Sequence, residues 1–151
     1  MPILLYGSEC WTLRHEDIRC LEVFQMCRLR WLLGVKLRDR VSNAEVRRKC
    51  NNQRSIEQQI RTNRLRSFGH VCRMGESRRP RQILNSNPPQ SWRVWPRAPR
   101  VTWMHQVKED VGRLQHSIDY AMQAAQNRDQ WKGILRDVAM APPAGRVVYI
   151  R

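Results

Sequence analysis

The sequence predicts an all-α protein, an irregular bundle of about five or six helices interrupted by a Pro/Arg-rich loop. Two observations carry this prediction: capping residues precede apolar residues at helical spacing, and turn residues follow them. A third is that strand-like character is confined to the end of the chain, at residues 147–150, where no partner strand is evident. We therefore expect helix in about half of the residues or more.

The length of 151 residues suits a single helical domain, which we place at residues 1–141, followed by a short tail at 142–151. The chain carries 28 Lys and Arg against 13 Asp and Glu, a formal net charge of +15, which favours polyanionic partners such as RNA or DNA. No apolar run approaches the length of about 20 residues that a membrane span needs, so no membrane partner is expected.

Five cysteines without a framework spacing, in a chain that shows no signal-peptide pattern, indicate free thiols in a reducing compartment. We expect an intracellular protein, nuclear or cytoplasmic. The apolar opening stretch, residues 1–11, suggests a fragment of something larger.

The first long helix is expected between a cap at Thr12 and a stop at Gly34. Acidic residues in its first turns and basic residues in its last match the helix dipole. Apolar residues cover most of its circumference, which predicts a place in the middle of the bundle. A short helix from Asn43 to about Cys50 follows, with Ser42 as its cap. Its basic run, residues 47–49, is expected to be a solvated face.

The central helix is expected over residues 55–74, where Ser55 and Gln58 form a capping box. Apolar residues recur on one side, and Arg66 and Arg73 fall on the other. Arg61 and Arg64 sit inside the apolar arc, so we expect their guanidinium groups to reach outward on their stems.

Residues 61–100 contain ten arginines and only one acid, Glu76. This charge predicts phosphate contacts along the central helix and its exit. The alternative is that these arginines are merely solvated or pair with Glu57 and Glu76. The candidate nucleic-acid-binding residues are Arg61, Arg64, Arg66, Arg73, Arg78, Arg79, Arg81, Arg97 and Arg100.

Residues 76–101 form the Pro/Arg-rich arm, whose five prolines exclude a long helix. We expect an irregular segment with one turn around residues 82–84. Trp92 and Trp95 alternate with arginines and are candidates for stacking on bases. The alternative, somewhat favoured, is that the two indoles fold onto the bundle.

Three further helices are expected after the arm. Thr102 caps the first, Ser117 caps the second, and Asn127 or Asp129 begins the third. Each presents one apolar stripe to the core. In the helix capped by Thr102, this stripe consists of Trp103, Val107, Val111 and Leu114.

The residues offer little for catalysis. Neither adjacent acid pair, Glu16 with Asp17 or Glu109 with Asp110, makes a two-metal clamp, because neighbours on a helix diverge by about 100°. The sequence lacks CxxC and HxxxH pairs, a glycine-rich phosphate loop and a nucleophile elbow. We expect no catalytic residue, no metal and no cofactor.

Six short motifs in one order resemble the C-terminal region of LINE-type, non-LTR retrotransposon endonuclease-reverse transcriptases, the part that follows the palm and thumb. They are YGSECW (6–11), LEVFQMCRLRWLLGV (21–35), RDRVSNAEVRRK (38–49), RLRSFGHVCRM (64–74), RAPR-x-x-W with VKED (97–110) and A-x-x-RDQW (125–131).

The resemblance implies a helical accessory segment that contacts template RNA or target DNA beside a palm and thumb missing from this sequence. It does not imply an enzyme, because the paired aspartates of the family's Tyr-x-Asp-Asp turn are absent: the sequence has no Asp-Asp. We thus expect a non-catalytic nucleic-acid-binding fragment of an RNA-directed DNA polymerase. The alternative is a domesticated or decayed helical protein-interaction module with no nucleic-acid role.

Overall fold

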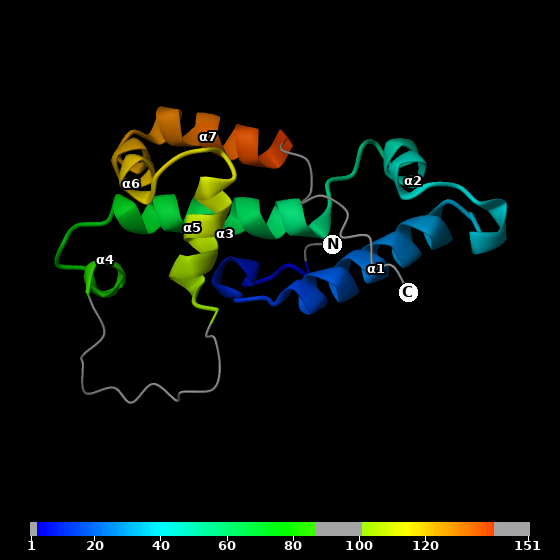
Figure 1. Cartoon of the computed structure of the whole chain (residues 1–151), viewed down its shortest axis with the longest axis horizontal. Coiled ribbons are helices and arrows are strands. Elements are labelled where there is room, and N and C mark those ends of the chain that lie inside the picture. The colour runs from blue at the N-terminus through cyan, green and yellow to red at the C-terminus, as the bar shows by residue number, and fades with distance from the viewer. Residues whose placement is uncertain (1–2, 87–100, 141–151) are drawn as a thin grey trace.

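A computed structural model of the chain describes residues 3–86 and 101–140. Within these residues it contains seven α-helices, two short 3-10 helices and no strand, so the fold is all-α (Figure 1). Helical residues make up 70% of the described part, which confirms the predicted class. The strand-like residues 147–150 lie outside the described residues, as do the rest of the tail and most of the Pro/Arg-rich arm.

Helix α1 (His15–Leu32) begins later than predicted. The backbone N–H of Arg14 donates to Asp17 Oδ2 at 2.9 Å, so an acid in the first turn, rather than Thr12, marks the helix start. The end agrees with the prediction: Gly34 adopts a φ of 65°, the left-handed region that glycine enters at no cost.

Helix α1 lies at the edge of the bundle, not in its middle, which corrects the sequence prediction (Figure 1). It packs against α2 (Asn43–Lys49) and α3 (Ile56–Cys72). Because its neighbours cover one side, only the stripe around Gln25 and Met26 is buried. Trp31 is 78% exposed and Leu32 70%, so the large apolar residues at the end of the helix face away from the core.

Helix α2 confirms the predicted cap, since the backbone N–H of Glu45 donates to Ser42 Oγ at 3.2 Å. Its basic run is not uniformly solvated. Arg47 donates to Glu22 Oε2 at 2.5 Å and to Gln25 Oε1 at 3.0 Å, which ties α2 to α1. Sequence spacing alone could not reveal these partners, because they lie on another helix.

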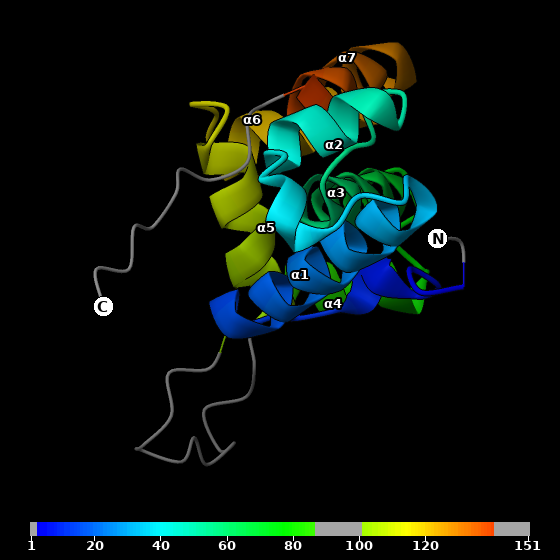
Figure 2. The same cartoon turned by 90° about the vertical axis from the view of Figure 1, so that its right-hand side faces the viewer.

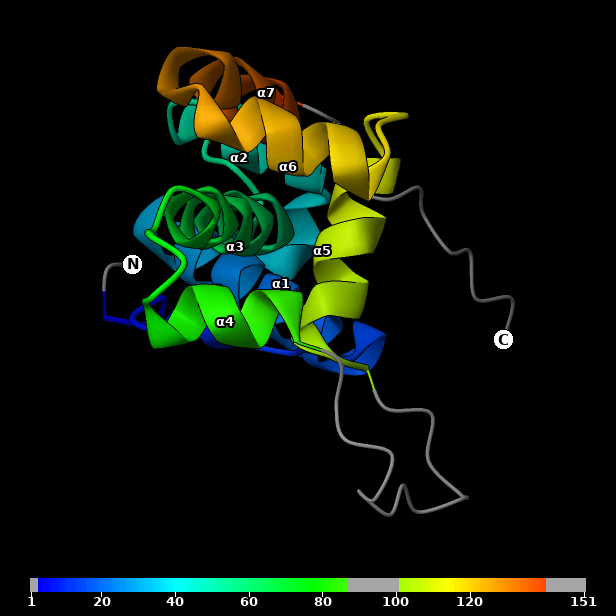
Figure 3. The same ribbon diagram turned by 90° about the vertical axis from the view of Figure 1, so that its left-hand side faces the viewer.

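Helix α3 is the centre of the fold. It contacts α1, α5 (Trp103–Gly112), α6 (Ile118–Gln126) and α7 (Arg128–Met140), together with the 3-10 helix η1 (Ser8–Cys10). Figure 2 shows α2 above α1, both in front of α3, and Figure 3 looks nearly along α3 with α6 and α7 above it. The core residues that α3 contributes are Ile56, Ile60, Leu65, Phe68 and Cys72.

Gly69 allows α7 to approach the backbone of α3 closely. A Cβ at this position would lie 2.0 Å from Trp131 Nε1. The indole instead lies over the helix and donates from Nε1 to the Leu65 carbonyl at 3.1 Å. Trp131 also packs on Phe68, with ring centroids 5.8 Å apart. A small residue at 69 thus sets the distance between the two helices.

The arm begins with an extra helix, α4 (Arg79–Asn85), where the sequence predicted only a turn. Pro80 is compatible with it because it sits in the first turn, where a backbone N–H has no helical acceptor. This helix raises the number of described helices from the predicted five or six to seven.

The predicted caps at Thr102 and Ser117 are confirmed: their hydroxyl oxygens accept backbone N–H groups of His105 and Tyr120, both at 3.1 Å. Asn127 Oδ1 accepts from the N–H of Asp129 at 3.0 Å ahead of α7. Helices α5, α6 and α7 complete the core around α3 with Val107, Val111, Ala121, Ala125, Ile134 and Val138.

Candidate nucleic-acid interface

Two of the candidate nucleic-acid-binding arginines are buried. Arg61 is 5% exposed and Arg64 is 3% exposed. The expectation that their guanidinium groups reach outward is therefore wrong. Both occupy the apolar arc, as the helical spacing indicated, but α5 crosses α3 there and supplies a carboxylate, so the charges are paired inside the fold.

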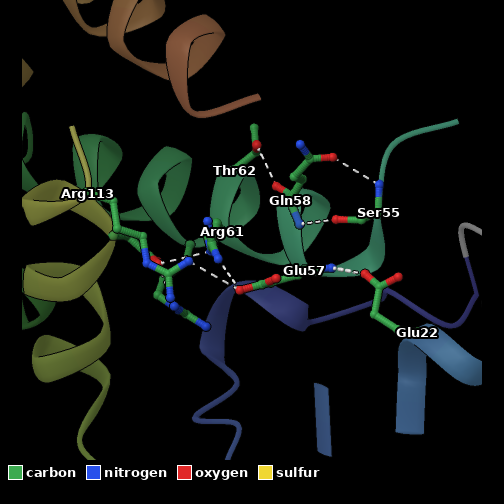
Figure 4. A network of polar contacts seen from close by, with 9 residues as sticks. Glu22, Ser55, Glu57, Gln58, Arg61, Thr62 and Arg113 are labelled. Carbon is green, nitrogen blue, oxygen red and sulfur yellow. Dashed lines mark hydrogen bonds and ion pairs between the residues drawn. The ribbon is translucent and has the colours of Figure 1, made fainter. Parts of the chain in front are cut away.

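The buried arginines belong to an ion-pair network between α3 and α5. Asp110 accepts from Arg64 Nη1 at 2.6 Å and lies 3.6 Å from Arg61 Nε. Arg61 also pairs with Glu57 one turn earlier, and Arg113 Nη1 lies 3.3 Å from the same carboxylate (Figure 4). Pairing with Glu57, the alternative to phosphate contacts in the sequence-based prediction, is thus confirmed for Arg61. The guanidinium groups of Arg61 and Arg64 connect helices and are too deeply buried to offer an open face to a phosphate.

The network extends to α1 through the start of α3. The backbone N–H of Glu57 donates to Glu22 Oε1 at 3.0 Å, and Figure 4 shows this contact beside the capping box of Ser55 and Gln58. One Glu22 carboxylate therefore serves both the N-terminus of α3, where the helix dipole favours an anion, and Arg47 of α2.

Burial dominates the electrostatics of Asp110. It raises the pKa of this carboxyl to about 6, although Arg64 and Arg61 beside it favour the charged form. Arg64 Nε and Gln106 Oε1 are buried without a hydrogen-bond partner among the described residues. Both residues line a hollow of about 300 Å³ between α1, α3 and α5. The carboxylate of Asp110 is thus paired with Arg64 and Arg61, whereas Arg64 Nε and Gln106 Oε1 stay without a partner beside the hollow.

Two further predicted arginines are half-buried. Arg73 Nη1 donates to the Ala125 carbonyl at 2.7 Å, near the end of α6, where helical carbonyls lack partners. Arg81 of α4 lies beside the Cys72 thiol, whose pKa is raised by burial and lowered by Arg81 and Arg73. These two cations therefore pack α6 and α4 onto α3 while keeping part of their surface in water.

The other candidate nucleic-acid-binding arginines within the described residues are exposed: Arg66, Arg78 and Arg79. They come from α3, the turn after it and the start of α4. Four predicted residues lie outside the described residues: Arg97, Arg100, Trp92 and Trp95.

The structure brings Arg66 together with three cations that the sequence analysis did not select. Arg54, Arg66, Lys132 and Arg136 line a groove of about 260 Å³ between α3 and α7, which we call the α3/α7 groove. No acid is among its described lining residues. Lys132 pairs with Asp129 at 2.8 Å, a contact weakened by the exposure of both groups. The floor of the groove consists of Thr62, Leu135 and Ala139.

A sequence signal for this groove exists in α7. Arg128, Lys132 and Arg136 follow one another at intervals of four residues and so share one side of the helix. The proximity of Lys132 and Arg136 to Arg54 and Arg66 depends on the packing of α7 along α3, which no local pattern encodes. The groove therefore required the tertiary structure.

The described residues contain no group of three or more His, Cys, Asp or Glu that could hold a metal ion. None of the described helices combines the length and the apolar character needed to cross a membrane. Comparison of the chain with family models, with curated proteins and with solved structures gave no match.

Proposed function

We propose that this chain is a non-catalytic nucleic-acid-binding unit that contacts RNA or DNA through phosphates. The observation that carries the proposal is the α3/α7 groove, where four cations from three parts of the chain meet without an acid among the described lining residues. The net charge of +15 adds a general attraction for polyanions. Arg78 and Arg79, outside the groove, are also exposed.

The motifs that resemble LINE-type reverse transcriptases support a more specific role. In this proposal the chain is a fragment of the C-terminal accessory region of an RNA-directed DNA polymerase, and it holds template RNA or target DNA beside a palm and thumb supplied elsewhere. It performs no polymerase or nuclease chemistry by itself, because the sequence has no adjacent aspartates for a two-metal site.

The test is the salt dependence of binding, measured by fluorescence anisotropy with labelled single-stranded and duplex oligonucleotides. Four phosphate contacts predict a slope of log affinity against log salt of about −3.6 on duplex DNA and about −2.8 on single strands. An affinity independent of salt, or no binding at low salt, would refute the proposal. Primer extension by the purified chain would refute its non-catalytic part.

A second candidate function, a helical protein-interaction module, is favoured by one observation. Phe24, Leu29, Trp31 and Leu32 of α1 line an open, apolar hollow together with residues near the N-terminus. Exposed apolar surface of this kind often marks a protein contact. A partner bound there would depend little on ionic strength, so the same salt titration separates the two functions.

A further inference from the structure

Next to the α3/α7 groove, on the other side of Arg66, the structure has a second and larger hollow of about 660 Å³. We call it the Tyr6 hollow. Its lining includes Leu5, Tyr6, Asn63, Arg66, Ser67 and His70, together with one acid, Glu9. Arg66 lines both hollows, so they are neighbours that share one wall.

The helical geometry of α3 explains this arrangement. Thr62 and His70 lie about 40° on either side of Arg66 around the helix axis, at intervals of four residues. Thr62 turns toward α7 and lies in the floor of the groove, whereas His70 turns toward the N-terminal segment and lines the Tyr6 hollow. A ligand that passes over Arg66 therefore enters both hollows without leaving the surface of α3.

Tyr6 is a large aromatic residue that the core does not use, since it is 87% exposed. The backbone that carries it is nevertheless fixed by the residues that follow. Gly7 follows with a φ of 69°, and η1 then packs against α3. Ser8 is buried there, and its Oγ accepts a hydrogen bond from Asn63 Nδ2 at 2.9 Å. An open ring held beside a cationic wall is the arrangement on which a nucleic-acid base stacks.

We propose that a single strand of nucleic acid crosses α3 at Arg66, with a phosphate in the α3/α7 groove and an adjacent base stacked on Tyr6. This inference rests on the proposed function and specifies the form of its ligand. A duplex keeps its bases stacked on one another, so only an unpaired base is free to cover the Tyr6 ring. Stacking accepts any base, and phosphate contacts read no sequence, so the preference for sequence is slight.

The experiment measures binding of a labelled oligouridylate and an oligothymidylate of about 12 nucleotides, and of a duplex of the same length, by anisotropy over a salt series. The Arg54→Gln/Arg136→Gln double variant is expected to reduce the single-strand slope by about 1.4, which is two lost phosphate contacts. The matched control, Arg38→Gln/Arg48→Gln, removes two exposed cations from outside both hollows and leaves the slope nearly unchanged.

Tyr6→Ala is expected to weaken single-strand binding roughly tenfold at every salt concentration, because a lost stacking contact releases no counterion. Its affinity for the duplex stays the same, and Tyr6→Phe, which keeps the ring, binds like the unaltered chain. Normal binding by Tyr6→Ala would overturn this inference and leave the proposed function standing. Equal slopes in the two double variants would overturn this inference and also remove the α3/α7 groove as the support for the proposed function. Failure of the unaltered chain to bind any oligonucleotide would overturn both.

Discussion

Gly69→Ala tests the packing of α7 on α3, the contact that also forms the α3/α7 groove. The added Cβ would lie 2.0 Å from Nε1 and 2.5 Å from Cδ1 of Trp131, so the indole must move. Trp131 is buried and packs on Phe68, which leaves it little room. Overpacking of this kind costs about 2 kcal/mol, and loss of the hydrogen bond to Leu65 costs about 1 kcal/mol more.

The higher helix propensity of alanine offsets about 1 kcal/mol, so the net loss in the free energy of unfolding is roughly 2 kcal/mol. Urea unfolding followed by circular dichroism measures it. Gly133→Ala in α7 is the matched control, because its Cβ would meet nothing within 4 Å and the same propensity should increase stability. Adding Trp131→Phe, which removes Nε1, should recover part of the loss in Gly69→Ala. Equal stability of the two alanine variants would refute this reasoning.

Three further predictions concern the start of α3 and its buried charges. Ser55→Ala removes the capping oxygen that accepts from Gln58 and should lower the free energy of unfolding by about 1 kcal/mol in urea titrations; Ser55→Gly should cost only a few tenths. Arg64→Ala leaves Asp110 without its closest partner and should lower the free energy of unfolding by about 3 kcal/mol. Its control, Arg79→Ala at an exposed site, should change the free energy of unfolding by less than about 0.5 kcal/mol. Similar losses in both variants would contradict the burial of the network. The pKa of Asp110 is about 6 in the folded chain and 3.8 ordinarily, so between these pH values the folded state binds more protons than the unfolded state. The contribution of Asp110 to the free energy of unfolding should therefore rise by roughly 1 kcal/mol from about pH 7 to about pH 5, and Asp110→Asn should abolish that rise.

The parts of the fold that were predictable from the sequence are those determined by neighbouring residues. Ser42, Ser55, Thr102 and Ser117 each accept a backbone N–H three residues later, and these caps depend on side chains within one turn. The glycine stop at Gly34 is local in the same sense. The starts of α2, α3, α5 and α6 and the end of α1 could therefore be identified from the sequence alone.

The parts that failed depend on which elements meet. The apolar circumference of α1 suggested a central position, but a helix with neighbours on one side buries only one stripe, and Trp31 stays exposed. Pro80 suggested an irregular arm, yet in a first helical turn it is tolerated. In both cases the local pattern allowed two structures, and packing selected between them.

Arg61 and Arg64 show how packing also moves the candidate interface. An arginine within an apolar arc can either extend its guanidinium group to water or pair it inside the fold, and the helix itself does not distinguish the two. Arg64 pairs inside the fold because Asp110, 46 residues later in the chain and on another helix, accepts its hydrogen bond. Once these two charges are neutralised in the interior, the cationic surface of α3 that remains for a polyanion is centred on Arg66. Arg66 meets its companions from α7 rather than from its own helix, so the candidate interface belongs to the contact between two helices. Gly69 is part of that same contact, and a substitution that separates α3 from α7 should weaken nucleic-acid binding even though it removes no charge.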